Sequence, residues 1–405
     1  MTAAGTSPRT DQPAAQRDAW ARRYAEVRGR TVALTSSLSA EDQQIQSMPD
    51  VSPTKWHLAH MSWFFETFLL EPSVPGYAAF DPQYGFLFNS YYEAVGARWP
   101  RPERGLLSRP SLDDVLAYRR HVDSAMARLI ETAGDAVWSG LQPLLDLGLH
   151  HEQQHQELIL MDIKHVFSLN PLAPAYAPAR ARAAPEAPPL EFIRFDGGLV
   201  EIGHDGEGFA FDNEAPRHKV WLEPFALANR LTTCGDYLAF IEDDGYARPE
   251  LWLSEGWSAV QREGWRAPLY WHEDENGERL LFTLSGLRRL DPAEPVCHLS
   301  LYEADAFAVM ADLDQAAVEV QPLQGWRGQG GRGLGRRIGR SQRVGPEHVL
   351  DVHQDQLLML LLVIEAELDQ GFQVRPLRRG RFDDQPRHGG VHMRPIGQDM
   401  LKRRP

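Results

Sequence analysis

Apolar residues between about positions 18 and 169 mostly recur three or four residues apart, which is the spacing of helices that each bury one face. Ser39 with Asp42 is expected to cap a break in the first helix, and Pro53 after Ser52 marks the start of the second. The pattern predicts a four-helix bundle, with helices at about 12–46, 53–71, 111–134 and 137–168.

The connection between the second and third predicted helices is roughly forty residues long and has little periodicity. Connections of that length inside a compact domain are usually functional or disordered. This one, at 71–110, is rich in Tyr, Phe and Trp, which favours an ordered structure. We therefore expect it to pack on the bundle and to contribute to function.

The pattern changes after the bundle. A Pro- and Ala-rich stretch is typical of an extended spacer, and the short β-type runs that follow, with a helix near 233–243, indicate a mixed domain. A Gly- and Arg-rich run at 325–340 opens a segment that has no Trp and no Tyr from Arg327 onward, so it is poorly suited to form an aromatic-rich core. The prediction is an α+β multidomain chain: disordered lead-in 1–17, four-helix bundle 18–169, linker 170–190, mixed domain 191–308 and divergent region 309–405.

Composition narrows the classes of function. The formal net charge of −14 over 405 residues provides no broad positive field, which argues against a nucleic-acid or acidic-membrane partner. Two cysteines build no disulfide framework. The N-terminus lacks the apolar core of a signal peptide, and the longest apolar run, at 357–366, is too short to cross a bilayer. We expect a cytoplasmic enzyme that acts on small molecules.

The segment HHEQQHQEL contains His151 and His155 at positions i and i+4, so one helix face can direct both imidazoles at one metal. It also satisfies the zinc-protease pattern H-E-x-x-H, in which Glu152 would be the general base. A protease needs a third ligand beyond the motif, and only His165 is available there. The residues therefore give the protease hypothesis little support.

A second pair of histidines strengthens the metal hypothesis. His57 and His60 lie three apart on a helix that is otherwise aromatic, so at least one imidazole is expected to be buried. Facing helices of a bundle commonly build metal centres, and a three-histidine site inside this bundle is the simplest arrangement. Three neutral ligands leave up to three open positions, which suits a redox metal that gathers oxygen and an anion. Zinc is the alternative.

One further pair could supply acid chemistry. Tyr91 and Tyr92 are adjacent on the aromatic connection, and a phenol near a metal can donate a proton to a reduced-oxygen species. When two tyrosines are adjacent, one side chain usually packs against the protein and the other faces solvent. The sequence does not choose between them.

Several motifs in order carry a resemblance to a known family: SPTKWHLAHMSWFFE, FNSYYEAVG, GLLSRP, GLHHEQQHQELILMDIKH, FDGGLVEIGHDG, FDNEAPRHKVWLEPFALANRLTTCGDYLAFI and PVCHLSLYEADAFA. Over about residues 20–308 the chain resembles the ergothioneine-pathway sulfoxide synthases called EgtB. The resemblance implies a DinB-like four-helix bundle followed by a sulfatase-modifying-factor domain of C-type-lectin-like fold. It implies that the iron(II) ligands are His60, His151 and His155, with His57 and His150 outside the ligand set.

The same resemblance implies an activity: O2-dependent coupling of a thiol to C2 of the imidazole of hercynine, giving a sulfoxide. The NSYYE segment resembles the cysteine-using branch, which makes Tyr91, with Tyr92 beside it, the implied proton donor. Gln154 matches a residue that contacts the betaine substrate. Arg109 is a candidate partner for a substrate carboxylate, because a guanidinium binds carboxylate through two parallel hydrogen bonds.

The resemblance stops after residue 308, where the family's remaining motifs give way to the Gly- and Arg-rich run. We interpret 309–405 as an altered, out-of-frame C-terminal region that leaves the second domain incomplete. Two other hypotheses stay open: a relative that transfers selenium or another thiol to hercynine, and a metal-binding module without turnover.

Overall fold

The structure is a computed structural model, and it describes residues 11–90, 92, 95–179 and 187–311. Most of the predicted divergent region, from 312 to 405, lies outside the described residues. The first helix begins at Asp11, inside the segment expected to be a disordered lead-in.

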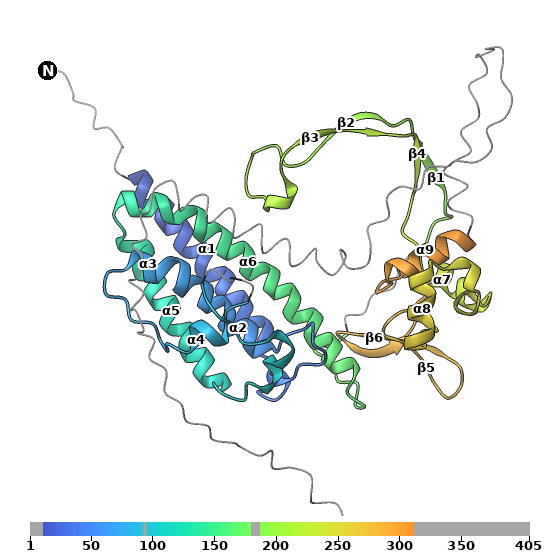
Figure 1. The fold of residues 1–405 in the computed structure, drawn as a ribbon, viewed down its shortest axis with the longest axis horizontal. Coiled ribbons are helices and arrows are strands. Elements are labelled where there is room, and N and C mark those ends of the chain that lie inside the picture. The colour runs from blue at the N-terminus through green and yellow to red at the C-terminus, as the bar shows by residue number, and fades with distance from the viewer. Residues whose placement is uncertain (1–10, 91, 93–94, 180–186, 312–405) are drawn as a thin grey trace, which may run out of the picture. The chain divides into compact units, whose positions relative to one another are not determined.

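The N-terminal half is a bundle of four long helices that run side by side (Figure 1). The first is shorter than predicted, because the chain turns after Thr35 and continues into a single 3-10 turn, η1 (Asp42–Gln44). Ser39 and Asp42 cap this break as expected: the Ser39 N–H donates to Asp42 Oδ2 at 2.9 Å and the Asp42 N–H to Ser39 Oγ at 3.1 Å. The four helices are α1 (Asp11–Thr35), α2 (Thr54–Phe65), α5 (Leu112–Thr132) and α6 (Asp135–Ser168).

Helix α2 is the central element of the bundle, and every one of its residues is buried. It begins at Thr54, so Pro53 is the residue that precedes the helix rather than its first member as predicted. The helix continues through a π-helical segment, η2 (Glu66–Leu70), into the short α3 (Glu71–Ser73). The buried aromatic residues of α2 explain why both of its histidines lie inside the bundle.

The aromatic connection packs on the bundle, as its composition predicted. It contains α4 (Tyr84–Leu87) and η3 (Arg101–Leu106). Phe80 and Tyr84 lie with ring centroids 5.4 and 4.9 Å from that of Tyr118 on α5. Phe88 is also buried. The connection is therefore held against the helices through its aromatic side chains.

The second half is the mixed α and β region that the sequence predicted, which confirms the α+β class. Strand pairing is antiparallel: β1 with β4, β2 with β3, and β5–β6–β7 in order. Its elements are β1 (Phe192–Phe195), β2 (Gly198–Ile202), η4 (Asp212–Glu214), β3 (His218–Leu222), β4 (Phe225–Ala228), α7 (Cys234–Glu242), η5 (Gly245–Ala247), η6 (Pro249–Leu251), α8 (Ser254–Glu263), β5 (Trp271–Glu273), β6 (Arg279–Thr283), β7 (Gly286–Arg289) and α9 (Leu301–Met310).

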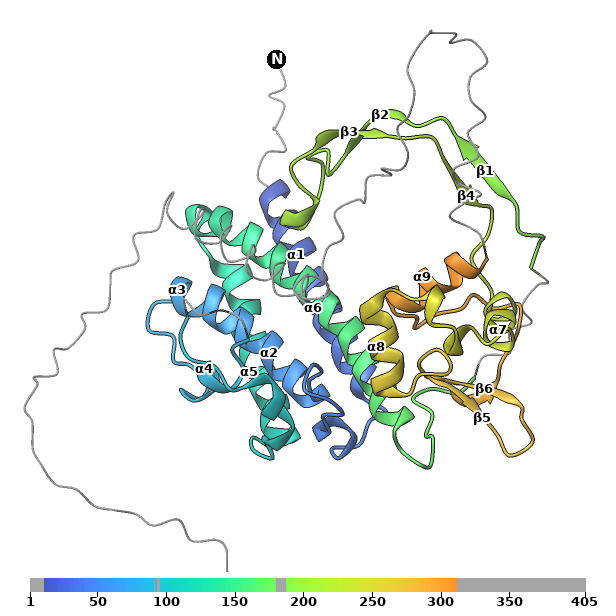
Figure 2. The ribbon, with the colours of Figure 1, turned by 45° about the vertical axis from the view of Figure 1, so that its right-hand side comes forward.

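The core of this second region forms where α7, α8 and α9 gather around β5 and β6 (Figures 1 and 2). Tyr237, Phe240 and Trp271 are among its buried aromatic residues. The Tyr246 hydroxyl donates to the buried Glu303 at 2.6 Å, so this buried carboxylate is hydrogen-bonded. Among the described residues, no helix is both long enough and apolar enough to cross a membrane.

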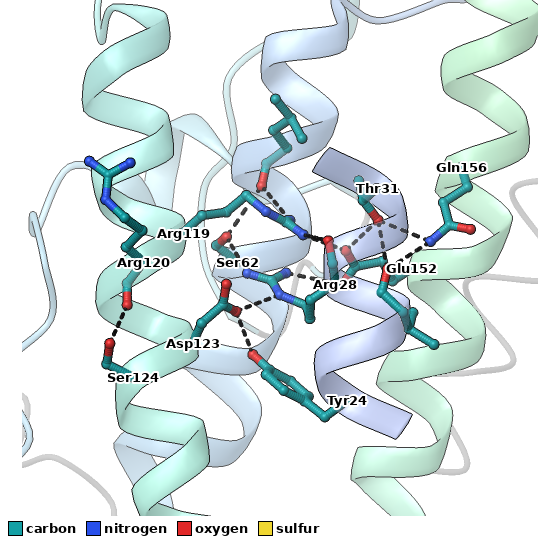
Figure 3. A network of polar contacts seen from close by, with 12 residues as sticks. Tyr24, Arg28, Thr31, Ser62, Arg119, Arg120, Asp123, Ser124, Glu152 and Gln156 are labelled. Atoms are coloured by element: carbon teal, nitrogen blue, oxygen red, sulfur yellow. Dashed lines mark hydrogen bonds and ion pairs between the residues drawn. The ribbon is translucent and has the colours of Figure 1, made fainter. Parts of the chain in front are cut away.

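A buried polar network ties all four bundle helices together (Figure 3). Glu152 of α6 accepts from Arg28 of α1 at 3.0 Å and from Arg119 of α5 at 2.6 Å. Thr31 donates to the same carboxylate at 2.6 Å. Arg28 also donates to Ser62 of α2 at 3.0 Å. Each helix of the bundle therefore contributes a side chain to one connected network.

The charges of this buried network compensate one another once Asp123, 2.6 Å from Arg28, is counted with Glu152. Burial alone would raise the pKa of Glu152, but Arg119 and Arg28, with the hydrogen bond from Thr31, lower it to about 2. The carboxylate keeps its charge because both guanidinium groups are beside it. Its contribution to stability is therefore complete above its ordinary value of 4.5 and is lost as the pH falls toward about 2.

We expect Glu152→Gln to lower the free energy of unfolding by about 3 to 5 kcal/mol, because it leaves two buried guanidinium groups facing a neutral amide. Urea unfolding followed by far-ultraviolet circular dichroism measures this at pH 7. Glu157→Gln is the matched control, since it makes the same change at an exposed position of α6 and should cost less than about 0.5 kcal/mol. Equal effects of the two substitutions would contradict the role given to the network.

Candidate metal centre

The structure brings together the three histidines that the sequence nominated. One ring nitrogen from each of His60, His151 and His155 lies within 4.8 Å of the others, and all three residues are buried. Nitrogens bound to a shared ion at about 2 Å lie roughly 3 to 4 Å from one another. Small side-chain rotations therefore suffice to place all three around one metal.

Close approach of α6 to α2 makes this convergence possible. Gly148 lies one helical turn before His151, and a Cβ at this position would meet the rings of Phe65 and Phe64 at 2.7 and 2.8 Å. Only a residue without a side chain fits in that gap. Gly148 thus lets the histidine-bearing part of α6 pack directly on α2.

The ring of His60 is held on three sides. It stacks between Trp56 and Trp63, with centroid distances of 4.6 and 5.4 Å and interplanar angles of 15° in both pairs. Its Nδ1 lies 2.7 Å from the carbonyl oxygen of Phe88, which can only accept, so Nδ1 carries the proton. Nε2 is then the atom with a free lone pair, which is the usual arrangement of a metal-bound histidine.

His151 carries the strongest indication that a ligand belongs here. Both of its ring nitrogens are buried, and neither has a hydrogen-bond partner among the described residues. A buried polar group without a partner costs free energy, so such groups are rare and require an explanation. A metal bound to one of these nitrogens would supply that explanation, and the residues present fit it.

The electrostatics keep all three imidazoles neutral at physiological pH. Burial is the largest cause, and it lowers the pKa of His60 and His155 well below the ordinary value, assisted by the neighbouring histidines. For His151 burial lowers the pKa to about 4, although Glu152 acts in the opposite direction. A metal ligand must offer an unprotonated nitrogen. Neutral imidazoles can therefore bind a metal cation without first losing a proton.

The position of Glu152 argues against protease chemistry. In an H-E-x-x-H protease this residue is the general base that activates the metal-bound water. Here both of its oxygens are engaged, Oε1 by Arg119 and Thr31 and Oε2 by Arg28. With a pKa of about 2 it is also a poor proton acceptor. The motif matches, but its glutamate holds the bundle together.

Two segments of the chain match known domain families. Residues 23–159 match the DinB superfamily, and residues 178–319 match the sulfatase-modifying factor enzyme 1-like domain. Together the two matches reproduce the order of domains that the motifs implied. The histidine site lies within the first of them.

Curated relatives resemble the chain across both domains. It is 30% identical to the hercynine oxygenase of Mycolicibacterium thermoresistibile over 298 residues, 72% of this chain and 62% of the relative. Identity to the hercynine oxygenase of Mycolicibacterium smegmatis is 30% over 300 residues, 73% of this chain and 66% of the relative. The hercynine oxygenase of Mycobacterium tuberculosis is 29% identical over 289 residues, 71% of this chain and 64% of the relative. This chain belongs to the EgtB family. The matched part spans just under two thirds of the length of each of these three relatives.

The remaining residues nominated from the EgtB resemblance occupy different environments. Tyr91 lies outside the described residues. Tyr92 is buried against Trp63 and Phe68, burial raises its pKa well above the ordinary value, and its hydroxyl has no partner within the described part of the chain. Gln154 and Arg109 are exposed, so their proposed substrate contacts remain predictions.

The structure places two further residues beside the histidine cluster that the sequence did not indicate. Arg104 is buried with its guanidinium carbon 3.4 Å from the ring centroid of Trp56, and thus one ring away from His60. Asp162 reaches His57, which in turn contacts His155. Asp162 lies seven residues after His155, on the same helix face, and that spacing is the signal that could have found it. Arg104 had no such signal, because its burial depends on how the connection folds.

We expect His155→Ala to abolish stoichiometric binding of Fe²⁺ or Zn²⁺, because two imidazoles remain where a stable site needs at least three protein ligands. Elemental analysis of anaerobically reconstituted protein measures the metal content. His150→Ala is the control, since this neighbouring imidazole is only partly buried and contacts Asp146 and Arg23 instead. Unchanged metal content in His155→Ala would exclude this residue as a ligand.

Proposed function

We propose that this chain is a non-haem iron(II) oxygenase that joins cysteine to C2 of hercynine, using O2, and forms hercynylcysteine sulfoxide. The observation that carries the proposal is the convergence of three buried, neutral imidazoles with unpartnered nitrogens on His151. Membership in the EgtB family supports the substrate class, since the curated relatives are named hercynine oxygenases.

The stoichiometry of this reaction closes with one molecule of O2. The C2–H bond of the imidazole and the S–H bond of the thiol are lost, and a C–S bond forms. One oxygen atom oxidises the sulfur to the sulfoxide, and the other leaves as water with the two hydrogens. No external reductant is required, because the two substrates supply all four electrons that O2 takes up.

His60, His151 and His155 would hold the metal. Iron(II) bound there would supply the redox chemistry that the reduction of O2 requires. Because the three ligands are neutral, the site keeps a positive charge that attracts an anionic thiolate. Trp56, Trp63 and Phe64 surround the histidines and exclude water from the same space.

Polar residues outside the histidine cluster would bind the substrates and move protons. We propose that Gln154 contacts hercynine and that Arg109 binds a substrate carboxylate. Both side chains are exposed. Tyr91 is proposed as the proton donor. The contacts of the Tyr92 ring with the rings of Trp63 and Phe68 support a packing role for the second tyrosine.

Oxygen uptake by anaerobically purified, iron-loaded protein tests the proposal. Uptake is expected only when hercynine and cysteine are both present, and mass spectrometry should find a product heavier than the sum of the substrates by one oxygen atom less two hydrogens. A selenium- or thiol-transfer reaction would instead form product without that oxygen. Stoichiometric zinc with no oxygen consumption would favour a metal-binding module without turnover.

We expect Tyr91→Phe to retain iron and both substrates while sulfoxide formation falls by roughly a hundredfold or more, the usual scale for loss of a general acid. Product formation under saturating substrates measures the effect. Tyr92→Phe is the matched control, since it removes one hydroxyl from the adjacent position, and it should leave the rate within about a factor of three. If the rates of the two variants were exchanged, the proton donor would be Tyr92.

A further inference from the structure

A fourth histidine of the bundle contacts the candidate metal site without belonging to it. His57 Nδ1 lies 2.7 Å from His155 Nδ1, and His57 Nε2 lies 3.0 Å from Asp162 Oδ2. The backbone N–H of Ser52 donates to the same oxygen of Asp162 at 3.1 Å. His57 and Asp162 are both buried. Carboxylate, imidazole and imidazole thus form a continuous chain that ends at His155.

Only one arrangement of protons satisfies this chain when the imidazoles are neutral. A carboxylate oxygen accepts and does not donate, so the proton of His57 is on Nε2 and its Nδ1 offers a lone pair. The contact between the two Nδ1 atoms needs one proton, which must therefore belong to His155. Nε2 of His155 is then unprotonated, as a metal ligand must be.

We propose that His57 and Asp162 are positioning residues that fix the tautomer and the ring orientation of His155, so that its Nε2 is presented to the metal. This inference rests on the proposed function only in requiring that the three histidines bind a metal. Asp162 acts on the site through two imidazoles, and its effect is transmitted by hydrogen bonds alone. Outer partners of this kind usually change metal affinity by about 10- to 100-fold.

The hydrogen bonds of Asp162 predict that a conservative substitution, Asp162→Asn, preserves the chain. In Asp162→Asn the Ser52 N–H still requires an acceptor, so the amide oxygen should take the place of Oδ2. That oxygen can also accept from His57 Nε2, and the proton order along the chain is kept. Asp162→Leu keeps the branched arrangement of heavy atoms but has no acceptor, so His57 loses the group that holds its proton on Nε2.

His57 has a corresponding pair of substitutions. His57→Phe keeps a buried ring but leaves the Nδ1–H of His155 without an acceptor. His57→Gln offers one acceptor and one donor on a planar amide, as the neutral imidazole does, and it can serve both neighbours. A role limited to filling space predicts the opposite ranking, because Phe replaces the ring more closely than Gln.

Titration of the full-length apoprotein with Co²⁺, read by the visible absorption of the bound ion and by competition with a chelator, tests the inference without turnover. We expect His57→Phe and Asp162→Leu each to weaken Co²⁺ binding by about 10- to 100-fold. His57→Gln and Asp162→Asn should stay within about threefold of the unsubstituted protein. The two residues act in series. The double variant His57→Phe with Asp162→Leu should therefore bind Co²⁺ about as tightly as whichever single variant binds it less tightly.

Three results would overturn the inference. Unchanged affinity in His57→Phe, with binding lost in His155→Ala, would remove the positioning role and leave the proposed metal site intact. A loss of Co²⁺ affinity in His57→Gln that equals or exceeds the loss in His57→Phe, or additive losses in the double variant, would remove the hydrogen-bonding role given to His57. Absence of Co²⁺ binding by the unsubstituted protein would reject the metal site and this inference together. If His57→Phe does not fold, the comparison of Asp162→Leu with Asp162→Asn decides the question.

Discussion

The buried carboxylate of Glu152 is the constraint on which the rest of the bundle depends. It is bound by Arg28 and Thr31 from α1 and by Arg119 from α5, at distances of 2.6 to 3.0 Å. A charge in that position tolerates little movement, because any loss of a partner leaves a buried ion uncompensated. The rotation of α6 about its axis is thereby fixed. Successive helical residues point about 100° apart, so His151 is turned away from Arg28 and Arg119 and toward α2.

The metal site is a consequence of that orientation. With α6 held by Glu152 and brought close to α2 at Gly148, the rings of His151 and His155 meet His60 inside an aromatic enclosure. The enclosure supplies three properties together. It keeps the imidazoles neutral, it excludes water, and it holds the ring of His60 between two tryptophans. Rigid surroundings of this kind are what a preorganised metal site requires.

The same sequence motif therefore serves two purposes on two faces of one helix. His151 and His155 face the candidate metal site, and the glutamate between them faces the structural network. In a zinc protease all three residues of this motif serve a single reaction. What separates the two cases is the presence of two buried arginines from other helices, and neither lies near the motif in the sequence.

The sequence by itself determined the local and repetitive features. Helical periodicity, the cap at Ser39, and the i and i+4 spacing of His151 and His155 are properties of short segments, so a pattern of a few residues is enough to predict them. The family followed from motifs in order. The tertiary structure alone decided that Glu152 binds the buried arginines. It also decided the burial of Arg104, the exposure of Arg109 and the contact of His57 with His155. Each of these depends on which side chains meet across helices that are distant in the sequence, and the free energy of burying a charge or an imidazole is set by those partners.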